Sequence, residues 1–139
     1  VVETVLIPDE RAQIEAELVR LADSGKVDLI FTTGGTGFAP RDVTPEATAS
    51  VIERLAPGIT EAMRAESAKI TPHAQLSRAI AGIRGRTLII NLPGSPKAAV
   101  ENLKVFLPAL PHAVETLRGE AYECGSREPE HAPHPTSQD

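Results

Sequence analysis

Two short, almost continuous apolar runs constrain most strongly what this chain can fold into. They span residues 27–33 (VDLIFTT) and 87–92 (TLIINL), and each ends directly in a turn that contains glycine. Such runs are typical of parallel strands that helices cover on both faces. Segments of helical periodicity separate and follow them, so we expect right-handed β-α-β crossovers and a three-layer αβα fold with a mostly parallel sheet.

The remaining elements follow from periodicity and from helix start and stop signals. Residues 1–7 are mostly β-branched and apolar, which predicts a further strand. Thr44 and Ser95 each precede a proline, which predicts that both are helix N-caps. Residues 70–85 are expected to be irregular or short extended structure. The predicted helices cover about residues 11–23, 44–55, 60–69, 96–107 and 112–117.

Composition limits the domain organisation and the classes of partner. A chain of 139 residues with 41% hydrophobic content holds one domain, which we place at residues 1–118. Residues 119–139 are almost free of apolar side chains and are expected to be a disordered tail or a linker. The formal charge of −5 argues against nucleic acid and anionic membranes as partners. No apolar run approaches the roughly 20 residues that span a bilayer, and a single cysteine, Cys124, fits a reducing, cytoplasmic compartment.

Three turns of the predicted sheet lie where such folds bind ligands, beyond the carboxyl ends of the strands. They are residues 8–10, 34–42 and 91–97. The Gly-Gly-Thr-Gly sequence at 34–37 would let backbone N–H groups approach a phosphate closely. It is neither a Walker loop, since no Gly-Lys-Ser/Thr follows, nor a dinucleotide fingerprint. A tight turn without a ligand accounts for the glycines equally well.

Charged residues in these turns are candidates for metal and phosphate binding. Asp9 and Asp42 could hold Mg²⁺ between them, although a helix cap and a turn residue are the more common roles of such aspartates. Arg41, Arg78 and Lys97 could bind a polyphosphate or be solvated surface charges. The histidines and Cys124 show no metal-ligand spacing, and no nucleophile elbow indicates acyl transfer.

Residues 28–46 (DLIFTTGGTGFAPRDVTPE) resemble the signature of the molybdopterin adenylyltransferase family, which includes Mog-like and MoaB-like domains and the G domain of gephyrin. Residues 76–78 (LSR), 82–85 (GIRG) and 88–95 (LIINLPGS) resemble further segments of that family in the same order. The similarity covers about residues 3–118. Relative to the family, the chain is expected to lack the first strand and helix, including a Ser-Asp turn that lines the same pocket.

The resemblance implies a reaction and a set of site residues. The family joins the phosphate of molybdopterin to AMP from Mg-ATP and releases pyrophosphate. By resemblance, Asp9 and Asp42 are the catalytic carboxylates, acting through Mg²⁺, and two serines help to form the pterin pocket. The implied substrate- and nucleotide-binding residues are Gly34, Gly35, Thr36, Gly37, Ser67, Ser77, Arg78, Asn91, Pro93, Gly94 and Ser95.

The resemblance also implies partners. A homotrimer is expected, together with a covalently linked molybdenum insertase domain in the parent protein. Two alternatives stay open. The chain could be a non-catalytic scaffold and oligomerisation module, as gephyrin-like proteins also cluster receptors, or a related domain that binds another small molecule.

Overall fold

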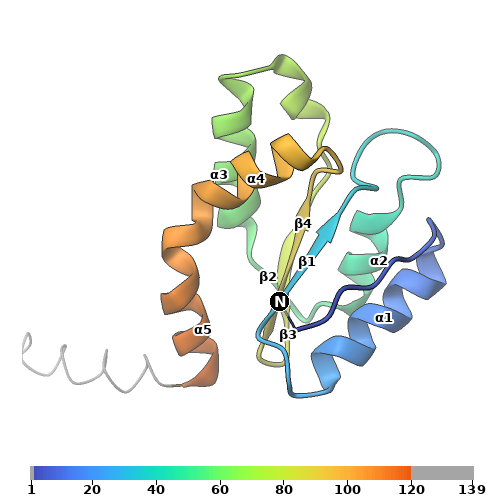
Figure 1. The fold of residues 1–139 in the computed structure, drawn as a ribbon, viewed down its shortest axis with the longest axis vertical. Helices are drawn as coiled ribbons and strands as arrows, with labels where there is room; N and C mark the ends of the chain where they lie inside the picture. Colours follow the sequence, from blue (N-terminus) through green and yellow to red (C-terminus); the bar gives the residue numbers. More distant parts are fainter. Residues whose placement is uncertain (1, 120–139) are drawn as a thin grey trace, which may run out of the picture. The chain divides into compact units, whose positions relative to one another are not determined.

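The computed structural model describes residues 2–119 of the chain, which divides into two compact units at residues 108 and 109. The first unit contains a four-stranded sheet in the order β1-β4-β3-β2 (Figure 1). Its strands are β1 (Leu29–Thr33), β2 (Arg54–Leu55), β3 (Ala81–Arg84) and β4 (Thr87–Leu92). β1 and β4 are parallel, whereas β3 pairs antiparallel with both β4 and β2. The sheet of the described residues is therefore mixed, with a parallel pair at one side.

Helices cover both faces of this sheet. α1 (Arg11–Asp23) and α2 (Thr44–Val51) pack together on one face, and α3 (Pro57–Ala68) and α4 (Pro96–Phe106) pack together on the other (Figure 1). The predicted three-layer α/β class is confirmed, as are the strands ending at residues 33 and 92 and the helices after residues 11 and 96.

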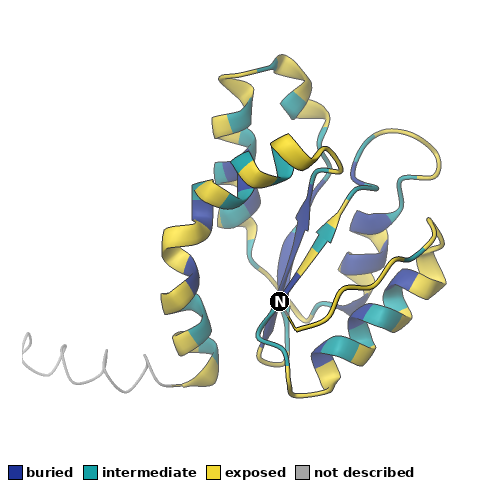
Figure 2. Cartoon of the chain, viewed as in Figure 1, coloured by how far each residue is buried: buried dark blue, intermediate teal, exposed yellow. Residues whose placement is uncertain are grey.

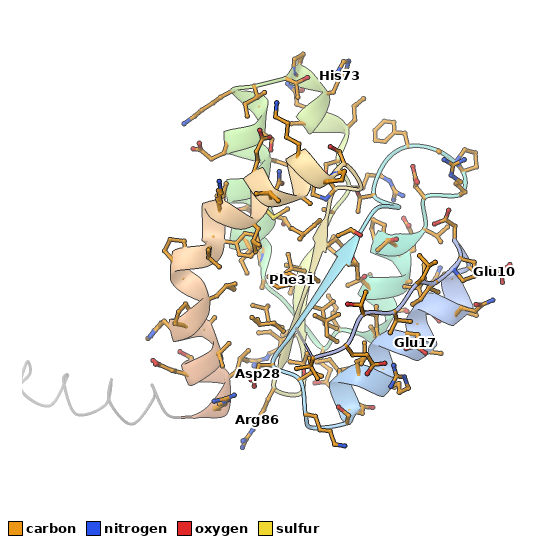
Figure 3. The ribbon with its side chains drawn as sticks, viewed as in Figure 1. Glu10, Glu17, Asp28, Phe31, His73 and Arg86 are labelled. Carbon is orange, nitrogen blue, oxygen red and sulfur yellow. The ribbon has the colours of Figure 1, made fainter. Side chains whose placement is uncertain are left out.

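The core lies on both faces of β4. All six residues of β4 are buried, with Ile89 and Ile90 at 0% exposure (Figure 2). Successive side chains of a strand point to opposite faces, so an uninterrupted apolar run needs a helical layer on each side. β1 contributes Ile30 to the core beside α1 and α2. Phe31 lies toward α4, with its ring centroid 6.4 Å from that of Phe106 (Figure 3).

The predicted strand over residues 1–7 is wrong for the described part, residues 2–7. This segment runs beside α1 without strand structure (Figure 1), and Leu6 is 99% exposed. Glu3 pairs with Arg20 of α1 at 2.7 Å, and Ile7 packs against the core. A strand requires hydrogen bonds to a neighbouring backbone, and no strand within residues 2–119 supplies them here. High β-propensity alone did not decide the structure.

The boundaries of α2 and α3 also differ from prediction. α2 ends at Val51 rather than near residue 55, because Ile52 adopts an extended conformation and leads into β2. α3 begins at Pro57, three residues before the predicted start. Residues 70–85 contain a 3₁₀ helix, η1 (Pro72–Leu76), and then β3, which turns at Gly85 (φ +60°) into β4.

The second unit is described only as far as residue 119. A 3₁₀ turn, η2 (Leu107–Ala109), spans the division, and α5 (Leu110–Arg118) follows. α5 covers the helical piece predicted at 112–117 and ends at Gly119, whose φ of +89° is a common helix end for glycine. The predicted tail lies, apart from Gly119, outside the described residues. Its assignment and the predicted boundary at residue 118 remain predictions.

Candidate functional site

The turns that follow β1 and β4 lie side by side at the carboxyl ends of these two parallel strands. The backbone N–H of Gly34 donates to the carbonyl of Leu92 at 3.0 Å, continuing the parallel pairing by one residue. A Cβ atom added to Gly94 would lie 3.2 Å from the Cα atom of Gly34. The two turns therefore lie in close backbone contact and form a rim of backbone, and a side chain at residue 94 would push against Gly34.

The second glycine joins this rim to the start of α2. Gly35 has φ +72°, and a Cβ atom there would lie 2.2 Å from Oγ1 of Thr44. The N–H of Thr44 donates to the carbonyl of Gly35 at 3.1 Å. Thr44 is the first residue of α2, after Val43, and makes no capping hydrogen bond, so the predicted N-cap role is wrong. The glycine turn thus contacts a helix N-terminus, where the backbone dipoles favour an anion.

Asp42 closes the loop of residues 34–42, which we call the glycine loop. Its Oδ2 atom accepts from the N–H of Ala39 at 2.9 Å, and its own N–H donates to the carbonyl of Ala39 at 2.9 Å. A Cβ atom on Gly37 would lie 2.9 Å from the same Oδ2. One carboxylate oxygen therefore holds the turn, as the turn-residue alternative expects, and the other is left for a ligand.

Asp9 contacts the glycine loop through Arg41. Its Oδ2 atom is 3.8 Å from Nε of Arg41, the residue before Asp42, and both partners of this long pair are largely exposed. Glu10, not Asp9, is the N-cap residue of α1, so the helix-cap alternative for Asp9 is wrong. Such exposed pairs contribute little stability. The pair is informative for position, because it places Asp9 beside the residue that precedes Asp42 in the glycine loop.

Arg78 has protein partners for every nitrogen of its guanidinium group. Nε donates to the carbonyl of Gly37 at 2.8 Å, Nη2 to the carbonyl of Asp42 at 2.6 Å, and Nη1 to the carboxylate of Glu46. The nearby guanidinium holds the pKa of Glu46 below its usual value, mainly through this hydrogen bond. The predicted ligand-binding arginine is thus engaged with the glycine loop itself.

Asn91 lies beneath the rim and is completely buried. Its Nδ2 donates to the hydroxyls of Thr32 at 2.9 Å and Thr48 at 3.0 Å, and its Oδ1 accepts from the N–H of Ile80 at 3.1 Å. The side chain therefore links β1, α2 and the segment before β3. Predicted as a nucleotide-binding residue, it is enclosed by protein and can affect a nucleotide only through the backbone it supports.

The two serines predicted for the pterin pocket come from separate segments on the α3 side. Ser67 of α3 accepts from Nδ2 of Asn102 of α4 at 3.1 Å, and Ser77 follows η1. Arg64 of α3 donates to the carbonyls of Ser77 at 3.3 Å and Ala79 at 3.0 Å. Arg64 and Asn102 were not among the predicted residues, because polar residues within amphipathic helices carry no distinguishing pattern.

The turn after β4 leads into a second helix N-terminus. Ser95 caps α4 as predicted, accepting from the N–H of Ala98 at 3.4 Å. Gly94 and Ser95 are exposed and Pro93 is half-buried. The starts of α2 and α4 therefore both lie next to the backbone rim of β1 and β4. Two positive helix ends and a run of glycine N–H groups make this end of the sheet suited to a phosphate chain.

A metal ion is compatible with this rim if the ligand supplies part of its coordination. No group of three or more His, Cys, Asp or Glu side chains is arranged to hold a metal within residues 2–119. Mg²⁺, however, is commonly bound through one or two carboxylates together with substrate phosphates and water. Asp9 and the free oxygen of Asp42 provide that donor set.

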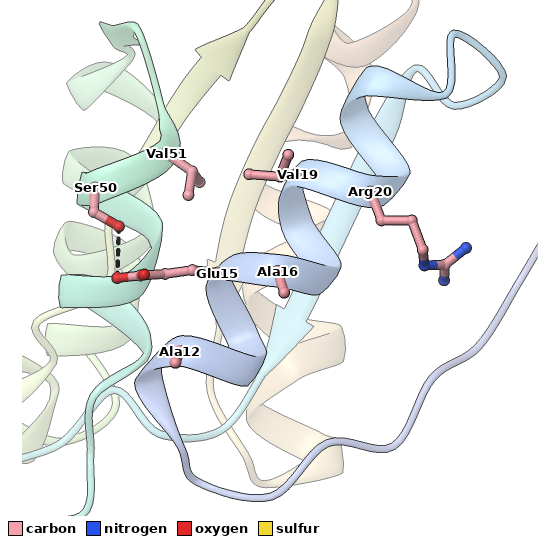
Figure 4. A pocket seen from close by; sticks show the side chains of 7 residues that line it. All are labelled: Ala12, Glu15, Ala16, Val19, Arg20, Ser50 and Val51. Atoms are coloured by element: carbon pink, nitrogen blue, oxygen red, sulfur yellow. Dashed lines mark hydrogen bonds between the residues drawn. The ribbon is translucent and has the colours of Figure 1, made fainter.

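A shallow groove elsewhere in the first unit has none of these features. It lies between α1 and α2 and is walled mainly by Ala12, Ala16, Val19 and Val51 (Figure 4). Within the groove, the hydroxyl of Ser50 donates to the carboxylate of Glu15 at 2.8 Å, and a hydrogen bond from Arg11 lowers the pKa of Glu15.

Within residues 2–119, no helix is both long and apolar enough to cross a membrane.

Comparison with known proteins identifies the family. Residues 1–112 match the family model described as "Probable molybdopterin binding domain". The chain is 49% identical over 114 residues to the molybdopterin adenylyltransferase of Helicobacter pylori, covering 82% of this chain and 65% of that protein. It is 56% identical over 109 residues to gephyrin of Dictyostelium discoideum, covering 78% of this chain and 15% of gephyrin. The chain thus spans less than two thirds of either relative.

A solved structure agrees with this relationship. The molybdopterin biosynthesis enzyme MoaB from Thermus thermophilus superimposes with a TM-score of 0.77 and is 54% identical, covering 82% of this chain and 72% of MoaB. The resemblance inferred from residues 28–46 is therefore confirmed. With a family model that matches most of its length and relatives at about half identity, this chain belongs to the molybdopterin binding domain family of molybdenum cofactor biosynthesis.

Proposed function

We propose that the protein containing this chain transfers an adenylyl group from Mg-ATP to molybdopterin and releases pyrophosphate. The observation that carries the proposal is the convergence of the glycine loop, Asp42, Asp9 and two helix N-termini on one end of the sheet. The name of the Helicobacter pylori relative, molybdopterin adenylyltransferase, supports the same reaction. Phosphate transfer is favoured by this arrangement because the exposed groups are backbone N–H donors and carboxylates rather than a nucleophile.

In the proposed reaction, a phosphate oxygen of molybdopterin attacks the α-phosphorus of ATP. A new P–O bond forms as the bond from the α-phosphorus to the oxygen between the α- and β-phosphates of ATP breaks, and that oxygen leaves with pyrophosphate. The protein forms no covalent intermediate. Its contribution is to align the two phosphates and to stabilise the negative charge that develops on the phosphoryl oxygens. We expect the N–H groups of the glycine loop and of the start of α4 to serve that task.

Asp9 and Asp42 would hold Mg²⁺, whose chemistry is to neutralise charge on the nucleotide phosphates. The hydrogen bond from Ala39 to Oδ2 of Asp42 orients the carboxylate and leaves Oδ1 for the metal. Among residues 2–119, the contact that joins Asp9 to the rest of the site is the long pair with Arg41. We expect its carboxylate to move more than that of Asp42 when the nucleotide binds.

The pterin is proposed to lie on the α3 side of the rim, near Ser67 and Ser77. Both hydroxyls already accept a hydrogen bond from the protein, from Asn102 and from the N–H of Ala79 respectively, so each can donate its proton to a ligand. The predicted homotrimer and linked insertase domain stay predictions. A purely scaffolding role remains the alternative, suggested by the match to gephyrin.

The test compares three Asp→Asn variants that differ in position. The full chain is incubated with ATP, Mg²⁺ and molybdopterin, and adenylylated molybdopterin and pyrophosphate are measured. Asp42→Asn and Asp9→Asn are expected to lower the rate about 100-fold or more, because both remove charge from the metal site. Asp23→Asn is the matched control, since Asp23 ends α1 and pairs with Arg84. Two outcomes would contradict the proposal: the unmodified chain forms no pterin-dependent product, or Asp42→Asn forms product at an unchanged rate.

A further inference from the structure

One residue, Arg78, holds the glycine loop at three points and the first turn of α2 at a fourth. In addition to the three side-chain contacts of Arg78 with Gly37, Asp42 and Glu46, its backbone N–H donates to the carbonyl of Thr36 at 2.8 Å. These acceptors lie before, within and after the turn that carries Asp42, at sequence separations of 32 to 42 residues. The segment before β3 therefore restrains both ends of the loop at once.

The loop needs an external restraint because its own sequence offers little. Three of its first four residues are glycine, which have no side chains to pack and the largest backbone freedom to lose. The side chain of Phe38 at the tip is 68% exposed and adds no packing. A planar guanidinium can donate in several fixed directions at once, so one arginine can bind separate carbonyls that a lysine could not.

The charge of Arg78 is also committed. Its Nη1 and Nη2 atoms both reach the carboxylate of Glu46, in the first turn of α2. This partner offsets the positive charge, and Nε and one donor of Nη2 are directed at carbonyls of the loop. Four of the five N–H donors are therefore in use, and a substrate phosphate that bound Arg78 through two donors would have to displace a protein acceptor.

We propose that Arg78 is a positioning residue, which acts on adenylyl transfer by holding the glycine loop and the backbone of Asp42 in place and not by contacting substrate. The inference rests on the proposed function for its effect on the reaction, whereas its effect on the loop can be measured without any substrate. It assigns Arg78 a different role from the substrate binding predicted from the sequence.

The first experiment separates positioning from substrate contact by kinetics. Arg78→Gln is expected to lower kcat about 10- to 100-fold, because small displacements of a catalytic group have effects of that size. KM for ATP should change less than about threefold, and a higher Mg²⁺ concentration should be needed for half-maximal rate, since Asp42 is displaced. Arg78→Lys should stay close to Arg78→Gln, because one ammonium cannot bridge the same acceptors.

Two further variants complete the kinetic test. Glu46→Gln should lower kcat in the same direction but less, and the double variant with Arg78→Gln should be no worse than Arg78→Gln alone, as expected for residues that act as one unit. Arg84→Gln is the control for stability, since Arg84 is also half-buried and makes three hydrogen bonds, to Asp23 and to the carbonyl of Val51. Its kcat should remain within about twofold of the unmodified chain.

Hydrogen exchange of the unliganded chain tests the loop directly. The N–H groups of Ala39 and Asp42 bond within the loop, and they should exchange at least about tenfold faster in Arg78→Gln but not in Arg84→Gln. The amides of β4 should keep their protection in both variants. Unchanged exchange in Arg78→Gln would overturn the inference, whatever the activity.

The kinetic outcomes are equally decisive. Two results would show that Arg78 binds substrate through its charge, and either would overturn the inference. The first is a rise of tenfold or more in KM for ATP in Arg78→Gln with kcat preserved. The second is recovery of activity in Arg78→Lys. An equal loss of kcat in Arg84→Gln would show that activity follows stability alone, with the same consequence. If the unmodified chain makes no product, the proposed function fails, and exchange alone still decides whether Arg78 holds the loop.

Discussion

Two arginines near the two ends of β3 hold opposite ends of the first unit in different ways. Arg84 ends β3 and forms a two-pronged pair with Asp23, at 2.9 and 3.1 Å, with a third hydrogen bond to the carbonyl of Val51. Arg78, three residues before β3, directs two of its side-chain nitrogens at carbonyls of the glycine loop. α2 lies between the two arginines. Arg78 binds Glu46 in the first turn of α2, and Arg84 binds the carbonyl of Val51, its last residue.

The difference is in what each arginine stabilises. At the amino end of β1 and β4, Asp23 at the end of α1 is bound to Arg84 at the end of β3. An added Cβ atom at Gly25 or Gly85, in the turns nearby, would have nothing within 4 Å. At the carboxyl end, the arginine restrains a segment whose glycines touch other backbone and side chains. Similar ion-pair chemistry therefore supports the fold at one end and shapes the candidate site at the other.

The largest expected effect on the free energy of unfolding comes from substituting a glycine at the carboxyl end, compared with one at the amino end. Gly35 and Gly85 both have positive φ, but a Cβ atom at Gly35 meets Thr44 at 2.2 Å, whereas nothing lies within 4 Å at Gly85. Gly35→Ala should lower the free energy of unfolding by about 3 kcal/mol, from backbone strain and the clash with α2. Gly85→Ala should cost only the strain, about 1 kcal/mol. Urea unfolding measures both, and equal losses would contradict the contact at Gly35.

Asn91 gives the next effect, beneath the carboxyl end. Asn91→Ala should lower the free energy of unfolding by about 2–3 kcal/mol, because the N–H of Ile80 and the hydroxyl of Thr48 lose their buried partner. Asn102→Ala is the comparison, since Asn102 also donates to a hydroxyl, that of Ser67, but at a less enclosed position. We expect about 1 kcal/mol there. A smaller loss for Asn91 than for Asn102 in urea unfolding would rule out the network.

These predictions depend on contacts that the sequence indicated only in part. The apolar runs ending at residues 33 and 92 identified the central strands because a short, uninterrupted apolar run between turns is typical of a strand covered on both faces. β3 was predicted only as irregular or short extended structure within residues 70–85: four residues that include glycine and arginine have no strand-like pattern, and pairing with β4 and β2 defines them. Residues 2–7 show the converse, since a strand-like composition without a paired neighbour stays non-strand.

The candidate site was predicted to a similar extent. Topology placed residues 34–37 and 93–95 at one end of the sheet, and the structure brings them into contact. The part played by Arg78 could not be predicted, because its acceptors are backbone carbonyls more than 30 residues away and carbonyls have no sequence signal. The partners of Asn91 were likewise hidden, since its position in a buried strand predicts burial but not the polar neighbours.

The smallest effect concerns pH and applies to both arginine pairs. Hydrogen bonds from Arg84 and Arg78 hold the pKa values of Asp23 and Glu46, respectively, below their usual values. A lowered carboxylate pKa adds stability above the unfolded-state pKa, about 4, and that stability is lost as the pH falls through the folded-state value. The deficits of Asp23→Asn and Glu46→Gln in urea unfolding should therefore be visible at pH 7 and shrink toward about pH 3. Deficits that grow on acidification would exclude these pairs as the cause.

The central claim is that the nucleotide binds at the carboxyl end of β1 and β4. A crystal structure of the chain with Mg²⁺ and a non-hydrolysable ATP analogue tests it most directly. We expect phosphate oxygens within hydrogen-bonding distance of the N–H groups of residues 35–37, with the metal ion bound by Asp42 and Asp9. A triphosphate in the groove between α1 and α2, or beside Arg84 at the amino end, would contradict it.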